Sequence, residues 1–398
     1  MKKKLNFSEK FFKILDHNKT FILFFLLFSI IYILNFEDYT KTFATDYQVR
    51  YKSYGLRIID QISNMDFSSN FLMWGDKNHH AYFNNYYIPQ LITGLLLKIS
   101  TNEYVFSIIS NILNMLLLFI SISNYFNVLN LKKKNQILTI FFIFFFVYLA
   151  NWVWVFWKLA EIYFLFVFSL VFYFLAKGIE NKKTNFILIS LFFVFISLIT
   201  KPQGFAVIPF FICSVILLYY KKLDFFKSIV LLLLCYFIFF PLLIFTVMKL
   251  DQSNMFAYFY IDGKINGIIL YKYEDFLNQF NLSNNNLTEL LYYYFLIIKK
   301  TVYQLTFLRE TYSIRHNIFL IPYTLVLYFF LIINLDYLIK NYNMFFKLTV
   351  LICIFSILLQ SSLGMSGEPN RTVLFNLIPL YILASISFHR WVKIIYNS

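Results

Sequence analysis

Four charged residues of this sequence lie where long apolar stretches begin or end, and their types could support a group-transfer reaction. Asp46 follows the apolar stretch 20–35, Glu161 opens another, Lys201 lies between two more, and Arg371 comes directly before the last. A carboxylate can accept or donate a proton, and Lys or Arg can bind an anionic group. Ionisable groups close to a membrane are costly, so these four are candidate functional residues.

A few further polar residues accompany Asp46 in the segment that follows the first apolar stretch. Tyr47 is next to it, and His79 and His80 come later in the same segment. The two histidines have no metal-ligand spacing of their own, so we expect a solvent or interface role in this loop, with contact to a bound substrate as the alternative. No phosphate-binding loop, zinc-protease motif or nucleophile elbow is present in the sequence.

Each candidate also has a structural explanation. Asp46 could be a solvated loop residue, and Glu161 could simply pair with a neighbouring lysine. A lysine at the end of an apolar stretch can extend its ammonium group to the membrane surface, as we expect of Lys158 beside its tryptophans. The sequence therefore proposes these residues without choosing between the two explanations.

The composition decides the class of protein that must position these residues. Hydrophobic residues make up 60% of the 398 positions and charged residues only 14%. A soluble domain has roughly a quarter charged residues, so this chain has too little polar surface for water. Its apolar stretches approach the roughly 20 residues with which a helix crosses the hydrocarbon core. The sequence thus predicts an all-α, polytopic transmembrane bundle that occupies residues 1–398 as a single membrane domain.

About ten apolar stretches are the expected spans, and the charges between them predict a topology. The expected spans are residues 20–35, 104–122, 137–152, 160–176, 185–200, 205–220, 229–248, 317–334, 348–363 and 372–388. If the N-terminus is cytoplasmic, the inner segments 1–19, 123–136, 177–184, 221–228, 335–347 and 389–398 hold 19 Lys and Arg residues, whereas the short outer segments hold only Lys158, Lys201 and Arg371. This asymmetry is the positive-inside pattern. We therefore expect a plasma-membrane protein with both termini in the cytoplasm.

Two long segments are expected outside the membrane, at residues 36–103 and 249–316. Each holds one apolar stretch, Tyr86–Leu97 in the first and Leu290–Ile298 in the second, that is short for a crossing. Counting either one alone as a span would invert every later loop and destroy the charge asymmetry. We expect interfacial or re-entrant helices at these two places.

The order of the outer motifs resembles the GT-C superfamily of integral-membrane glycosyltransferases, which includes protein O-mannosyltransferases and the lipid A aminoarabinose transferase. The features that carry the resemblance, in chain order, are Ala44-Thr45-Asp46-Tyr47, Tyr86-Tyr87-Ile88-Pro89, Glu161 at a helix start, Lys201-Pro202-Gln203-Gly204, and Arg371 followed by Pro379. Tyr47 stands where the family often has a second acid, and Thr372 stands where an Arg-Tyr pair is frequent.

The resemblance implies a GT-C-like fold and a polyprenyl-phosphate sugar as donor. The acceptor would be a hydroxyl of a glycan, lipid or protein on the extracytoplasmic face, and no nucleic acid would be involved. Asp46 would act as general base in an inverting displacement. Lys201 and Arg371 would bind the donor phosphate, and Glu161 would orient the acceptor or hold a divalent cation with Asp46.

Two other functions are compatible with the sequence. An O-antigen polymerase or ligase also has many spans and one large late outer loop, and segment 249–316, which contains Arg309, Arg315 and His316, could be that loop. A lipid or glycan flippase or transporter would not be an enzyme. Transporters place charges near the bilayer midplane, whereas the candidates here lie at span ends.

Overall fold

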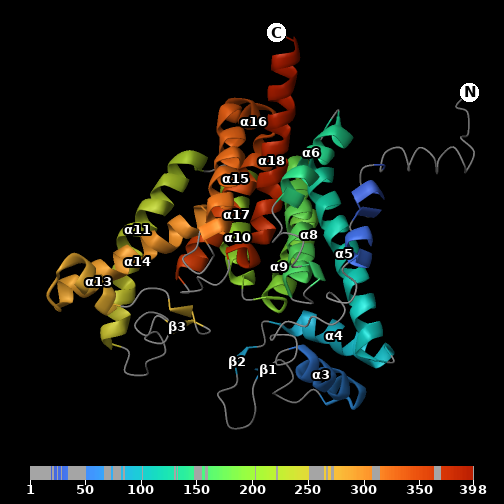
Figure 1. Ribbon diagram of the computed structural model, residues 1–398, viewed down its shortest axis with the longest axis horizontal. Coiled ribbons are helices and arrows are strands. Elements are labelled where there is room, and N and C mark those ends of the chain that lie inside the picture. Colours follow the sequence, from blue (N-terminus) through green and yellow to red (C-terminus); the bar gives the residue numbers. More distant parts are fainter. Residues whose placement is uncertain are drawn as a thin grey trace, which may run out of the picture. The chain divides into compact units, whose positions relative to one another are not determined.

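Helices make up almost all of the regular structure in the part of the chain that the structure, a computed structural model, describes (Figure 1). The described residues are 19, 22–24, 26–27, 29–34, 51–66, 73–74, 82–83, 86–100, 102–129, 131, 133–147, 155–156, 160–201, 203–220, 223–250, 264–265, 268–269, 273–306, 314–362 and 369–397. Among them, the strands form only two ladders, β1 (Met73–Trp74) with β2 (Tyr82–Phe83), and β3 (Lys264–Ile265) with β4 (Ile268–Ile269). The predicted all-α class is confirmed.

Within the described residues, four helices are long and apolar enough to cross a membrane. They are α5 (Glu103–Val128), α8 (Ala160–Asn181), the part Phe225–Leu243 of α11 (Phe225–Leu250), and the part Leu377–Ile395 of α18 (Pro369–Asn397). A fifth candidate is the bent pair formed by α15 (Ile314–Ile333) and α16 (Leu335–Asn341), which meet at 59°. These helices support the assignment to a membrane.

Shorter apolar helices occupy the remaining predicted spans. They are Ile22–Leu34, α6 (Lys134–Val147), α9 (Thr184–Leu198), α10 (Gly204–Ser214) with its π-helical continuation Val215–Tyr219, and α17 (Asn343–Ser362). Each predicted span thus overlaps a described helix. By length and composition only four or five of these helices qualify, so the number ten stays a prediction.

The helices fall into two compact units, and the predicted single domain is not tested by this division. Unit 1 comprises Met1–Gly204, Phe330–Phe346 and Leu377–Ser398, and unit 2 comprises Phe205–Phe329 and Lys347–Asn376. In unit 1, α8 packs against both α5 and α9 (Figure 1). Of the 18 most apolar consecutive residues of α8, 72% are buried, which makes α8 the central helix of this unit.

Two helices of the predicted outer segment 36–103 pack against each other in unit 1. α3 (Ser53–Ser63) and α4 (Tyr87–Ile99) meet at Gly55 and Gly94, where a Cβ on Gly55 would lie 2.9 Å from the backbone nitrogen of Gly94. Only glycine allows so close an approach. With 13 residues, α4 is about 20 Å long, short of the hydrocarbon thickness of about 30 Å. A helix is confirmed here, and its interfacial position stays a prediction.

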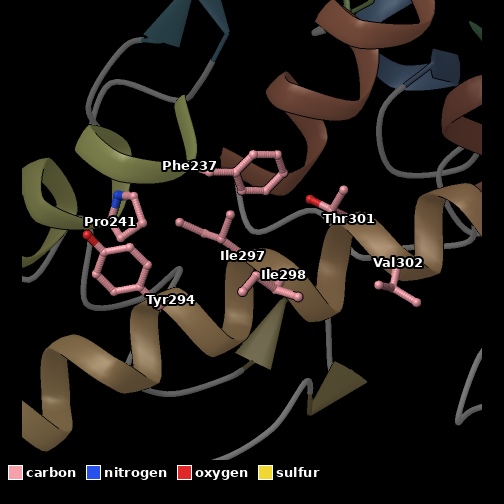
Figure 2. Close-up of a pocket in the computed structure, with 7 residues that line it drawn as sticks. All are labelled: Phe237, Pro241, Tyr294, Ile297, Ile298, Thr301 and Val302. Carbon is pink, nitrogen blue, oxygen red and sulfur yellow. The ribbon is translucent and has the colours of Figure 1, made fainter. Parts of the chain in front are cut away.

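Unit 2 contains α11 and the helices of the predicted outer segment 249–316. α13 (Tyr273–Phe280) and α14 (Asn286–Thr306) share a buried core with aromatic residues of α11. Between α11 and α14 lies an apolar cavity of about 300 Å³, in which Phe237 and Pro241 face Ile297 and Tyr294 (Figure 2). The Tyr294 hydroxyl donates a hydrogen bond of 2.8 Å to the carbonyl oxygen of Ile238. This bond links α14 to α11.

Candidate functional site

A buried ion pair joins two of the predicted site residues, Glu161 and Lys201. The Lys201 Nζ lies 3.0 Å from the Glu161 Oε1, and the two side chains are only 6% and 1% exposed, respectively. Glu161 lies in the first turn of α8, and Lys201 lies in the turn between α9 and α10. Charged side chains are almost never fully buried unless they are paired. The pair is therefore a built feature of unit 1.

The turn that carries Lys201 is held by backbone hydrogen bonds and by one glycine. The carbonyl oxygen of Ser197 accepts hydrogen bonds from the backbone N–H groups of Thr200 and Lys201, and the Lys201 carbonyl accepts one from Gly204 at 2.8 Å. A Cβ on Gly204 would lie 2.6 Å from the Ser197 carbonyl carbon. The Lys-x-x-Gly spacing thus has a structural reason, because the glycine lets α10 begin directly against the end of α9.

The α3–α4 hairpin closes over this region. The backbone N–H of Ile88, in the first turn of α4, donates a hydrogen bond of 3.0 Å to the carbonyl oxygen of Ile199. Ala160, which precedes Glu161, is fully buried with Tyr51 and Phe106. These contacts bury the start of α8. In such a site electrostatic interactions are stronger than they are in water.

Buried amide side chains add hydrogen-bonding capacity to unit 1. Asn114 of α5 donates a bond of 2.8 Å to the carbonyl oxygen of Val155, but its own Oδ1, like the Gln203 Oε1, accepts none from the described residues. Gln203 lies two positions after Lys201. A buried acceptor of this kind normally has a partner, which can be an ordered water or a ligand. Sugar hydroxyls are donors that such acceptors could bind.

The structure does not reach the other predicted site residues. Asp46, Tyr47, His79 and His80 lie outside the described residues, and so does Arg309 of the rival interpretation. Arg371 belongs to the backbone of α18, and Arg315 and His316 to that of α15, whereas their side chains are not described. Of the four main candidates, Glu161 and Lys201 are therefore the two that the structure brings together.

A metal site is not formed by the described residues, where no three His, Cys, Asp or Glu side chains lie close enough to hold an ion. The predicted divalent-cation site depends on Asp46, which is outside those residues. In this structure one oxygen of the Glu161 carboxylate accepts a hydrogen bond from the Lys201 ammonium group.

Polar residues inside α5 were missed in the sequence, although a signal was present. Ser107, Asn111 and Asn114 follow the i, i+4, i+7 spacing of one helix face, and all three are fully buried. In a membrane helix such a face marks the side that meets other helices. This polar face of α5 is turned toward the interior of unit 1, where α5 packs against α8.

Comparison with protein-family models, curated proteins and solved structures finds no match for this chain.

Proposed function

We propose that this chain is an integral-membrane glycosyltransferase that moves a sugar from a polyprenyl-phosphate donor to a hydroxyl acceptor on the extracytoplasmic face. The observation that carries the proposal is the buried pair of Glu161 and Lys201 at the start of α8, beneath the loop helix α4. A buried lysine at the end of apolar helices is well placed to meet a phosphate that arrives through the membrane. The order of Asp46, Glu161, Lys201 and Arg371 along the chain supports it as well.

The proposed reaction is a single displacement. The acceptor oxygen attacks the anomeric carbon, the bond from that carbon to the phosphate oxygen breaks, and its electron pair leaves with the polyprenyl phosphate. Asp46 takes the acceptor proton as general base. Lys201 and Arg371 stabilise the negative charge on the departing phosphate. Glu161 holds Lys201 in place before the donor arrives and orients the acceptor.

The proposed topology places this site outside the cytoplasm. We propose ten spans in the plasma membrane with both termini cytoplasmic. The distribution of Lys and Arg supports this arrangement, as does the overlap of each predicted span with an apolar helix. The donor's lipid tail would lie in the bilayer while its phosphate lies at the outer surface.

The direct test measures release of polyprenyl phosphate. Purified protein in nanodiscs is supplied with a panel of polyprenyl-phosphate hexoses and pentoses and with membrane extract as the source of acceptor. We expect release with at least one donor, and a loss of about 100-fold or more in Asp46→Asn because general-base catalysis contributes at least that much. The matched control is Asp66→Asn, an exposed acid later in the same segment.

Two outcomes would contradict the assignment. If no donor releases polyprenyl phosphate, the proposed glycosyltransferase activity is wrong. If Asp46→Asn releases it at nearly the wild-type rate, Asp46 is not the general base. Arg371→Ala should mainly raise the KM for the donor. If its donor dependence is unchanged, the assignment of Arg371 to the phosphate is wrong.

A flippase or transporter is the second candidate, because a charged pair buried within a helix bundle is also a feature of transport pathways. Transport of the polyprenyl-linked sugar across vesicles, without any covalent product, would favour this candidate. In that case Asp46→Asn should not affect transport, whereas variants of Glu161 or Lys201 should abolish it.

A further inference from the structure

A bend at the end of α15 creates a polar cavity in unit 1, distant in sequence from the ion pair. α16 leaves the direction of α15 by 59° at Asn334. The buried Asn334 Nδ2 donates hydrogen bonds to the carbonyl oxygen of Ser387, at 3.1 Å, and to its Oγ, at 2.9 Å. These bonds attach the bend to α18. The bend is therefore a fixed part of the structure.

The cavity beside this bend has a volume of about 550 Å³, within the usual range of about 300–1,000 Å³ for ligand sites. Its lining combines ionisable side chains with apolar ones. The ionisable residues are Arg390 of α18 and Asp336 and Lys340 of α16, and the apolar ones include Ile332 and Ile333.

The two basic side chains keep their charge available to a ligand. The Arg390 guanidinium lies over the Tyr337 ring, 3.9 Å from its centroid, which orients the group and leaves its N–H donors at the edge. Among the described residues, neither Arg390 nor Lys340 lies within ion-pair distance of an acid, Asp336 included. Two positive charges against one negative give the cavity a net charge of +1 and favour an anion.

Apolar surface adjoins these charges. Ile332 is 69% exposed and Ile333 is 43% exposed, at the end of a candidate span. The sequence places this end of α15 and of α18 on the lysine-rich side of the membrane, which is the expected cytoplasmic side. A free anion would use the charges alone, whereas an anionic lipid would use both the charges and the exposed isoleucines.

We propose that this cavity binds an anionic phospholipid of the inner leaflet. Arg390 and Lys340 hold the phosphate, for which the planar Arg guanidinium offers two donors. An acyl chain lies along Ile332 and Ile333. The site is separate from the proposed glycosyltransferase site and does not depend on that proposal, because it requires only that α15 and α18 end at a membrane surface.

The test compares lipids with the same acyl chains by native mass spectrometry. Full-length protein in uncharged detergent is titrated with phosphatidylglycerol and with phosphatidylcholine. We expect wild-type protein to bind phosphatidylglycerol at least tenfold more tightly. Arg390→Gln and Lys340→Gln should each reduce this preference at least fivefold. The matched control is Lys393→Gln, which removes an exposed charge from the same helix outside the cavity and should keep the preference within twofold.

Three results would overturn the proposal. The first is equal binding of the two lipids by wild-type protein, and the second is a preference that Lys393→Gln lowers as much as Arg390→Gln does. The third is competition by soluble glycerol phosphate at the same concentration as the lipid, which would show that the cavity binds a free phosphate compound. We expect glycerol phosphate to need at least a hundredfold excess. Arg390→Lys, which keeps the charge, should retain part of the preference and so separates a binding defect from misfolding.

Discussion

Replacement of Lys201 by methionine tests the energetics of the buried ion pair. Lys201→Met keeps an unbranched apolar stem and removes the ammonium group that lies 3.0 Å from the Glu161 carboxylate. At that distance, and with an effective dielectric constant of about 20, the attraction between unit charges is about 5.5 kcal/mol. Glu161 is 1% exposed, so water cannot replace the lost partner. We expect the free energy of unfolding to fall by about 3–5 kcal/mol, the usual cost of removing one member of a buried pair.

The double variant Glu161→Met/Lys201→Met should regain most of this loss. Each buried ion costs several kcal/mol in lost hydration, and this cost disappears when both charges are removed. We expect the double variant to lie within about 1 kcal/mol of wild type, since apolar replacements of buried pairs are often neutral or stabilising. The double variant should nevertheless lose the proposed sugar transfer, because it lacks both charged groups.

The measurement is reversible unfolding in mixed micelles with increasing dodecyl sulfate, followed by tryptophan fluorescence. The control is Lys177→Met, because Lys177 lies 3.6 Å from Glu180 in a pair that is 29% and 38% exposed. A partly exposed pair contributes about 1 kcal/mol or less. The reasoning is refuted if Lys201→Met costs no more than Lys177→Met, or if the double variant is as unstable as the single one.

Two glycine substitutions test the packing that surrounds the pair. In Gly204→Ala the new methyl group would meet the Ser197 carbonyl carbon at 2.6 Å, so we expect the Lys201 turn to move and the stability in micelle unfolding to fall by about 1–3 kcal/mol. Under the proposed function, the same variant should release polyprenyl phosphate more slowly than wild type. In Gly94→Ala the methyl group would meet the Gly55 carbonyl carbon at 2.5 Å; we expect α3 to separate from α4 and to be cut faster in limited proteolysis, and a cleavage rate equal to that of wild type would contradict this contact.

The positions of the helices could be predicted from the sequence, because a helix that lies in lipid needs a continuous apolar stretch. Blocks such as 104–122 and 160–176 lie inside α5 and α8. The bend at Asn334 could not be predicted in this way, because it depends on hydrogen bonds to Ser387, which is 53 residues later in the chain. Similarly, α14 extends beyond the apolar stretch Leu290–Ile298, because backbone hydrogen bonds continue through Lys299 and Lys300, which hydropathy excludes.

Two residues of the candidate site could be predicted from the sequence, but the contact between them could not. The sequence singled out Glu161 and Lys201 because each is a charge at the end of an apolar block. That they contact each other follows from the packing of α8 against α9, which brings together residues 40 positions apart. The amide of Asn114 was missed, because a polar residue in an apolar block becomes significant only when the facing helix is known. Gln203 was quoted as part of the Lys201-Pro202-Gln203-Gly204 turn, but the sequence assigned it no role.

The ion pair also has a consequence for how the chain is made. While α8 is being synthesised, Glu161 lacks its native partner Lys201, which is 40 residues further along the chain. At about 5–20 residues per second the ribosome needs roughly 2–8 s to supply it. An acid in a single inserted helix raises the cost of partition into lipid. We therefore expect α8 to wait at the translocon until α9 follows, and the two helices to enter the bilayer as one hairpin.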